Sequence, residues 1–468
     1  MSSIFACLNP GPSLSRDFVK DQFQLGKSRG PDFSKFGSVG IQIYMGTHYN
    51  LKRDLREDDI DIPYSGCYDI RVIYSGTITN LEELNEVEED PTRILVQLYR
   101  DYGFEQMLLL LKGQFSLILL DQSVSVEFCM LYVARDAFGL APLYVSDSEH
   151  QVPIAFASER SMLTSFVNPR QFPAGTYSIY RLTNGVYQTW HPVKTDIKYY
   201  TLPLPNMSPI PNMPMSKLLD AIVGAIGNHV AEEPIGCMIS GGMKSAAVAA
   251  ILSKTVSGPL KTFFVGFADD PMLLPRGYKK AETLAKYIGS DHTAILLSKF
   301  DYEDVLEQVR ERFSGELAES ELKNAAVFFA GAKWIRDRTG VKVVYLGAGM
   351  DELVGSDAEV DPIEYDKQAR ETIRGFPSGR GLSVDRCFGA FGLDTRMPFL
   401  ERDLVDFYFR MPVLSRMESR ENIEACFSLA LANPFLDKYL DWDIVKCKPK
   451  SPFKSAFSKG TLTSEHIR

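Results

Sequence analysis

The chain has 468 residues, of which 45% are hydrophobic and 11% aromatic. This much apolar material can form two or three buried cores, so the composition excludes a disordered chain. The formal net charge of −9 argues against a general nucleic-acid or membrane-surface binder, which would need clustered Lys and Arg, and favours small-molecule or protein partners.

The start of the chain, MSSIFACLNPGPSLSRDF, has neither the cationic residues nor the apolar run of a secretory signal. No other stretch reaches the roughly 20 apolar residues that a membrane span needs. We therefore expect an intracellular, cytoplasmic protein without membrane insertion. Seven cysteines without a CxxC pair and six dispersed histidines support neither a disulfide framework nor a zinc site.

Residues 1–200 contain short apolar or alternating runs, separated by Gly, Asn and Asp turns, that are typical of β-strands. The clearest runs are VGIQIYM, YDIRVIYSG, QFSLILLD and MLYVARD, and one helix-like stretch lies at TRILVQLYRDYG. This part is expected to form antiparallel strands with a few helices.

The pattern changes after a linker at residues 201–214, TLPLPNMSPIPNMP, whose five prolines remove backbone donors and prevent a regular element. Residues 215–468 then alternate between helix and strand patterns. These are MSKLLDAIVGAIGNHVA, IGCMIS, KSAAVAAILSK, LKTFFVGF, KKAETLAKYIG and KVVYLGA. Such alternation predicts a parallel sheet with helices on both faces.

The sharpest local feature is IGCMISGGMKSAAVAAIL, in which an apolar strand ends in Ser240, Gly241 and Gly242 and a helix begins near Lys244. A Gly-rich turn before a helix N-terminus presents backbone N–H groups that suit a phosphate. The same pattern also fits a tight structural turn, so the other motifs of the chain must decide between the two.

The segment SGGMKS (240–245) resembles the SGGxDS pyrophosphate loop of the asparagine synthetase family. Four further motifs follow in the family's order. The strand FFVGF, through Val265 and Gly266, resembles the adenine-contacting strand, LGAGMDELVG resembles SGEGSDExFGG, and GLDTRMPFLERDLVDF resembles G-x-E-x-R-x-PFLD. KPKSPF is similar to the family's R-x-K-x-x-F.

The first part of the chain carries the same resemblance. SRGPD, SGTITN, GQFSLILLD, ARDAFGLAPLY, FASER and FPAGTY resemble the family's HRGPD, NGEIYN, GxFAxxxxD, xRDxxGxxPLY, xASExK and xPAGxY. The resemblance implies an N-terminal α/β/β/α sandwich of the N-terminal-nucleophile hydrolase (Ntn) type, the class II glutamine amidotransferase fold, over 1–200. It implies a doubly wound PP-loop ATP-pyrophosphatase domain over 215–468, related to β-lactam synthetase-type ligases.

The resemblance also indicates that the glutaminase site has lost its chemistry. Ser2 stands where the family has its nucleophilic Cys, Ser75 replaces the oxyanion-hole Asn, Thr77 replaces the Glu of NGEIYN, and Asn50 replaces the Arg that clamps the glutamine carboxylate. We call these four the amide-site positions. Loss of one oxyanion donor alone typically costs roughly 3 kcal/mol in the barrier.

Two other residues bear on that site. Cys7 lies too far inside the chain to replace the missing nucleophile, and Asp90 is the one glutamine-contacting position that is retained. A serine nucleophile would need activation by a base, because a hydroxyl is a much weaker nucleophile than a thiol. The sequence therefore predicts no glutamine hydrolysis.

The synthetase site is more mixed. Expected cofactor-binding residues are Ser240, Gly241, Gly242, Lys244, Ser245, Val265, Gly266, Gly347 and Asp351. Asp351 is also a candidate Mg²⁺ ligand, Lys450 a candidate catalytic cation, and Lys448 replaces an Arg.

Several substitutions put both ATP and Mg²⁺ in doubt. Lys244 occupies the position of a metal-ligating Asp, Ala348 replaces a Glu, and Leu346 and Met350 replace serines. Lys244 could contact a phosphate directly or be a solvated surface lysine. We predict that its ammonium group lies at the mouth of the SGGMKS turn and forms an ion pair with Asp351.

Two retained features also have structural readings. Arg396 and Asp394 could be a buried pair, and Glu352 could cap a helix. Two functions remain open: a catalytically impaired pseudoenzyme that serves as a structural or assembly subunit, with protein partners or self-association, and an ATP-dependent, AMP-forming amide ligase that uses ammonia or a substrate amine.

Overall fold

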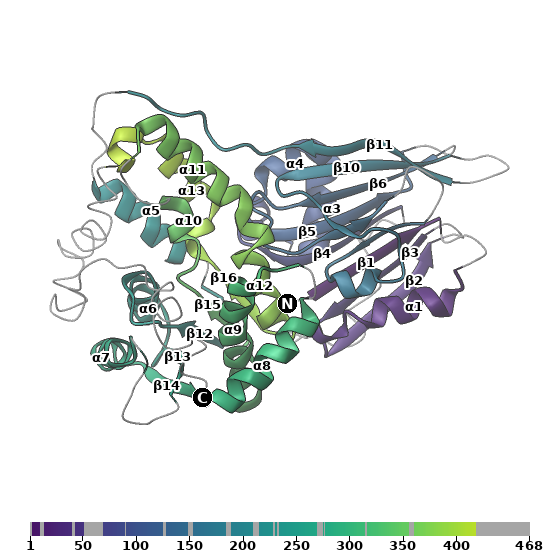
Figure 1. Cartoon of the computed structure of the whole chain (residues 1–468). Helices are drawn as coiled ribbons and strands as arrows, with labels where there is room; N and C mark the ends of the chain where they lie inside the picture. Colours follow the sequence, from purple (N-terminus) through teal and green to yellow (C-terminus); the bar gives the residue numbers. More distant parts are fainter. Residues whose placement is uncertain are drawn as a thin grey trace. The chain divides into compact units, whose positions relative to one another are not determined.

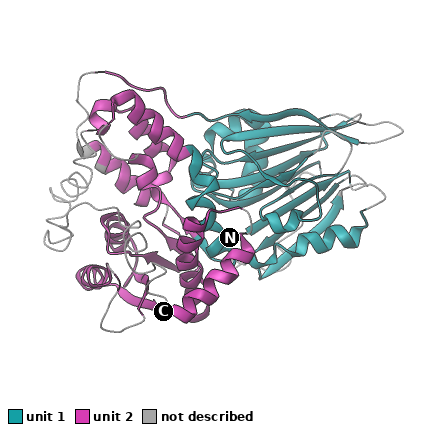
Figure 2. Ribbon diagram, viewed as in Figure 1, with its two compact units in different colours: residues 1–201, 374–394 teal, residues 202–373, 395–468 magenta. Residues whose placement is uncertain are grey.

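The computed structural model describes residues 2–9, 14–39, 43–50, 69–88, 90–124, 128–147, 153–183, 189–208, 215–227, 230–231, 234–268, 275, 277–313, 316–354 and 360–417. Two compact units are present (Figure 2): residues 1–201 together with 374–394, and residues 202–373 together with 395–468. Lys448 and Lys450, with the whole KPKSPF motif, lie outside the described residues.

The first unit contains two sheets whose described strand pairings are all antiparallel. One has the order β2-β3-β1-β8-β7-β9 and the other β11-β10-β6-β5-β4. Their bounds are β1 Ser2–Leu8, β2 Phe33–Val39, β3 Ile43–Tyr49, β4 Ile70–Ile78, β5 Gly113–Asp121, β6 Phe128–Arg135, β7 Tyr144–Ser146, β8 Ile154–Ala157, β9 Arg170–Gln171, β10 Thr176–Thr183 and β11 Thr189–Lys198.

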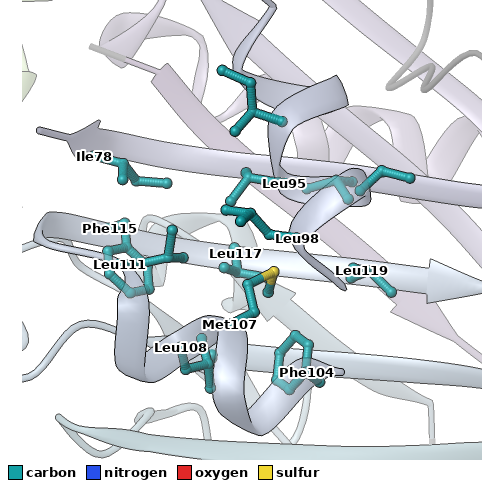
Figure 3. Close-up of a cluster of buried hydrophobic side chains, with 14 of the residues drawn as sticks. Ile78, Leu95, Leu98, Phe104, Met107, Leu108, Leu111, Phe115, Leu117 and Leu119 are labelled. Atoms are coloured by element: carbon teal, nitrogen blue, oxygen red, sulfur yellow. The ribbon is translucent and has the colours of Figure 1, made fainter. Parts of the chain in front are cut away.

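Strand β5 explains how these layers stack. Successive side chains of a strand point to opposite faces. Ile118 and Leu120 belong to a core shared with the other sheet, whereas Phe115, Leu117 and Leu119 belong to a core beneath two helices (Figure 3). Both faces of β5 are therefore covered, which is why its sequence is a continuous apolar run. The layers give the α/β/β/α sandwich that the sequence predicts.

The helices of this unit are α1 Arg16–Gln24, α2 Leu81–Leu84, α3 Pro91–Tyr102, α4 Phe104–Leu110 and α12 Arg380–Gly389. Helix α3 shows clear boundary signals. The side chain of Asp90 accepts a hydrogen bond from the backbone N–H of Thr92, Pro91 occupies the first turn, and Gly103 ends the helix with a positive φ of 75°. Local chemistry thus sets both ends of α3.

The second unit is built on a five-stranded sheet in the order β14-β13-β12-β15-β16. The pairs β12–β13, β12–β15 and β13–β14 are parallel. In Figure 1 these strands run between α6 and α7 on one side and α8 and α9 on the other, so the sheet is doubly wound as predicted. The strands are β12 Ile235–Met238, β13 Lys261–Phe267, β14 Asp291–Leu297, β15 Val343–Tyr345 and β16 Asp394–Arg396.

The helices of this unit are α5 Met215–Gly227, α6 Met243–Thr255, α7 Tyr278–Ile288, α8 Lys299–Arg312, α9 Glu319–Arg338, α10 Met350–Val354, α11 Pro362–Gly375 and α13 Arg402–Arg410. The chain moves from β12 outward to β13 and β14, and then returns to the other side of β12 as β15. This reversal is a topological switch point, where open α/β sheets bind ligands beyond the carboxyl ends of their strands. Within the described residues, no helix is both long and apolar enough to cross a membrane.

Candidate functional site

Two loops meet beyond the switch point of the second unit. The loop after β12 contains Gly241, whose φ of 75° is in the left-handed region, and leads into α6. A Cβ atom on Gly347, in the loop after β15, would lie 2.7 Å from the backbone nitrogen of Ser245. Glycine is therefore required where the loops touch, and the structure brings these sequence-predicted residues together.

The two serines of SGGMKS hold the loop internally. The Ser245 hydroxyl donates to the carbonyl of Gly242 at 3.0 Å, and Ser245 Oγ accepts from the backbone N–H of Ser240 at 3.1 Å. Ser240 Oγ lies 3.1 Å from Ser245 Oγ. These bonds fold the loop onto the start of α6, so both serines contribute to its shape independently of a ligand.

Lys244, the second residue of α6, forms an ion pair with Asp351, the second residue of α10. This confirms the ion pair that the sequence suggested. The side chains are 22% and 48% exposed, so the pair lies at the surface of the loops. The pair places an ammonium group beside the carboxylate that the sequence offered as a magnesium ligand. Among the described residues, no group of three or more His, Cys, Asp or Glu could hold a metal ion.

The remainder of the LGAGMDE loop has structural contacts. Leu346 and Met350 are each only 2% exposed, so the apolar residues at these positions lie in the core. Glu352 is buried and accepts a hydrogen bond from the backbone N–H of Gly349 at 3.1 Å, just before α10 begins. Its carboxylate caps the helix, which confirms the structural reading of this residue.

Val265 and Gly266 lie on β13, next to β12 in the sheet. A Cβ atom on Gly266 would lie 2.9 Å from the ring of Pro275, so the chain packs closely there. Their role as an adenine contact stays a prediction. Asp394 and Arg396 are both buried, and Asp394 accepts a hydrogen bond from the Thr77 hydroxyl at 3.2 Å.

The amide-site positions of the first unit are hydrogen-bonded within the protein. The Ser2 hydroxyl donates to the carbonyl of Tyr74 at 3.3 Å, and the Ser75 hydroxyl donates to the carbonyl of Ser2 at 2.6 Å. The two serines are 9% and 1% exposed. The Ser2 hydroxyl therefore has a backbone carbonyl as its acceptor, whereas a nucleophilic hydroxyl needs a neighbouring base that can take its proton.

Cys7 and Asp90 have structural environments. Cys7 lies in the interior of β1 with no exposed surface, and burial raises the pKa of its thiol to about 12. A buried thiol with a raised pKa is a poor nucleophile, which agrees with the expectation that Cys7 cannot replace the missing cysteine. The Oδ1 atom of Asp90 accepts from both the backbone N–H and the hydroxyl of Thr92, so this carboxylate caps α3.

The sequence did not reveal a buried network of four charged residues. Two of them lie in the motifs SRGPD and FASER, and the other two lie in α12. Arg29 donates to Glu159 at 2.8 Å and to both carboxylate oxygens of Asp385 at 2.7 and 3.0 Å. Arg386 donates to the other oxygen of Glu159 at 3.0 Å. The motifs SRGPD and FASER were visible in the sequence, but their partners come from α12, which is more than 200 residues away along the chain.

A second retained motif also has an internal role. In ARDAFGLAPLY, the guanidinium of Arg135 donates to the carbonyls of Ala141, Phe172 and Gly139 at 2.7 to 2.8 Å. The neighbouring carboxylate of Asp136 accepts three backbone N–H groups of the following turn. These motif residues hold the turn together in the core of the unit.

Comparisons with known proteins agree with the two units. The family model described as "Asparagine synthase" matches residues 217–360, and that described as "Glutamine amidotransferase domain" matches residues 1–174. The asparagine synthetase [glutamine-hydrolyzing] of Homo sapiens is 27% identical over 472 residues, which cover 92% of this chain and 80% of that protein. The Mus musculus protein of the same name is 28% identical over 447 residues, covering 85% and 76%.

Solved structures include a glutamine phosphoribosylpyrophosphate amidotransferase from B. subtilis in complex with ADP and GMP. It is 10% identical, covers 63% of this chain and 81% of its own, and has a TM-score of 0.33.

Proposed function

We propose that this chain, which belongs to the asparagine synthetase family, is a catalytically impaired member that serves as a structural or assembly subunit. The observation that carries this proposal is the ion pair between Lys244 and Asp351. This pair places the positive charge of Lys244 next to Asp351, the candidate metal ligand, at the loops where a magnesium nucleotide would bind. The charges of these two side chains balance each other.

The division between retained and replaced residues in the first unit supports the same proposal. Retained motif residues such as Arg29, Arg135 and Asp136 make buried contacts that hold the fold. The replaced residues are those that would touch a glutamine substrate. Selection for fold without selection for chemistry leaves this pattern, because the loss of a buried charge partner destabilises the protein and the loss of a nucleophile does not.

The first test is glutamine hydrolysis. We expect no glutamate from glutamine above the buffer background, and no gain from Ser2→Cys alone, because the oxyanion donor and the carboxylate clamp are still missing. A human asparagine synthetase preparation serves as the positive control. Glutamate formation by the unmodified protein would refute the proposal for this unit.

The second candidate function is an ATP-dependent, AMP-forming amide ligase supplied with ammonia or a substrate amine. The intact SGGMKS turn at the switch point of the sheet favours it. Equilibrium titration with ATP and Mg²⁺ distinguishes the two candidates. We expect weak or undetectable binding for the impaired subunit, whereas micromolar, Mg²⁺-dependent binding would favour the ligase.

A structural subunit must also assemble. We expect light scattering after size-exclusion chromatography to give a mass above the 52.5 kDa of one chain, either alone or with a protein partner that co-purifies in fixed ratio. A monomer without such a partner would contradict the assembly role.

A further inference from the structure

Residues 374–394, which we call the strap, lie between parts of the chain that belong to the second unit but are themselves part of the first. The centre of the strap is α12. From this helix, Asp385 accepts from Arg29 and Arg386 donates to Glu159, while Arg29 also donates to Glu159. All four residues are at most 5% exposed.

These four groups form a neutral series of two guanidinium groups and two carboxylates. Each charge is paired inside the core, so removing one partner leaves an uncompensated buried charge. Such a change should weaken the attachment of the strap far more than the removal of an exposed charge would.

The end of the strap contacts two of the amide-site positions. Asn50 Nδ2 donates to the carbonyl of Gly392 at 2.5 Å, and the Thr77 hydroxyl donates to Asp394 at 3.2 Å. A Cβ atom on Gly392, which has a φ of 67°, would lie 3.1 Å from Pro31 and 3.3 Å from the Asn50 amide. The strap is therefore packed closely against these positions.

We propose that the strap is an intramolecular lid over the remnant amide site, closed at its end by Asn50 and Thr77 and locked at its centre by the buried charge series. The identification of the closed site rests on the proposed function. Asn50 and Thr77, which differ from the family's motifs, form hydrogen bonds with the strap. The strap would therefore close the amide site in addition to the loss of its catalytic residues.

Thiol labelling with a maleimide tests this, with each cysteine read separately as a peptide by mass spectrometry. Cys387 lies in the strap, Cys7 in β1 of the same unit and Cys237 in β12 of the second unit, and all three are fully buried. All three should be protected in the unmodified protein. In Asp385→Asn, Cys387 should label at least about tenfold faster while Cys7 and Cys237 stay protected, because only the strap opens.

The matched control is Asp101→Asn, which removes an exposed carboxylate of α3 and should leave all three thiols protected. If Asp385→Asn does not fold, Arg386→Met tests the same series at its other end. Labelling of Cys387 in the unmodified protein would overturn the lid. The lid would also be overturned if Cys387 became reactive in a variant only together with Cys7. The same conclusion would follow if Cys387 stayed protected in every variant.

Closure of the amide site itself is tested with Ser75→Cys, which places a thiol at a position that is 1% exposed. This thiol should be protected alone and should react when Asn50→Ala and Thr77→Ala are added, while Cys7 stays protected. Equal labelling with and without those two changes would overturn the closure. The readout does not depend on activity, so glutamine hydrolysis could contradict the proposed function while the lid is confirmed.

Discussion

Lys244 is the single residue on which the proposed function depends most, because its charge has the same sign as that of a magnesium ion. The ion pair with Asp351 was predicted from the sequence because both residues lie in motifs whose relatives converge on one site. For Glu352 the sequence offered a helix cap as an alternative to a catalytic role, and the hydrogen bond from the backbone N–H of Gly349 supports the cap. Residues inside recognisable motifs could thus be placed before the structure was known.

We predict that Lys244→Asp gives a measurable increase in Mg²⁺-dependent ATP binding by calorimetry. The change replaces a cation with a potential ligand beside Asp351, although Ala348 still lacks the family's carboxylate. Amide synthesis should stay undetectable. The matched control is Lys279→Asp, since Lys279 is also the second residue of a helix, α7, and is exposed. Equal binding by the two variants would contradict this role of Lys244.

His48 was not singled out from the sequence, yet it is fully buried in the first unit. Its Nε2–H donates to the carbonyl of Phe23 at 2.9 Å, which leaves Nδ1 to accept from the Ser34 hydroxyl at 2.7 Å. Its ring stacks on that of Phe23 with centroids 3.8 Å apart. Burial, together with the nearby charge of Lys27, lowers the pKa of His48 to about 4.

The unfolded chain therefore binds a proton at His48 more readily than the folded chain does. The resulting stability is present above the ordinary pKa of 6.5 and is lost as the pH falls toward 4. We predict that His48 contributes a decrease on the order of 3 kcal/mol in the free energy of unfolding across this range. Denaturant unfolding at several pH values should show a shallower decrease for His48→Gln and an unchanged one for His191→Gln, on the exposed strand β11. If the free energy of unfolding changed with pH in the same way for the unmodified protein and both variants, the predicted role of His48 would be contradicted.

At the scale of elements, helix α3 could be predicted closely because its boundary residues act locally. The dipeptide Asp90–Pro91 and the residue Gly103 each restrict the backbone without help from the rest of the fold. Helix α12 could not be assigned in the same way. Its burial within the first unit depends on Arg29 and Glu159, and local periodicity carries no information on partners so distant in sequence.

We predict that Asp90 acts as a cap and not as a ligand for an amide substrate. Asp90→Ala should lower the free energy of unfolding by about 1 kcal/mol, whereas Asp90→Asn should restore most of it, because asparagine also caps helices. Thermal unfolding measures both. The matched cap Ser15→Ala in α1 should behave as Asp90→Ala does. Equal destabilisation by Asn and Ala would show that the negative charge, and not the cap, matters.

The architecture of the whole molecule was predictable because it depends on patterns that extend over many residues. Alternating strands before the proline-rich segment gave the antiparallel sandwich, and helix–strand alternation after it gave the parallel sheet. The strap was not predicted, because the Gly- and Pro-rich segment RGFPSGRG at its start marks a turn but carries no information that the chain returns to the first unit. The proposal of catalytic impairment, in contrast, rests on single positions, since one missing nucleophile or one reversed charge can abolish a reaction.

The central claim, that the family's fold persists here without its chemistry, is tested most directly by pyrophosphate release. Purified protein is incubated with ATP, Mg²⁺, ammonia and a panel of carboxylates that includes aspartate, with Lys450→Ala as the blank. We expect the unmodified protein and the blank to release pyrophosphate at the same background rate with every carboxylate. Carboxylate-dependent release above the blank would contradict the account and identify the chain as a ligase.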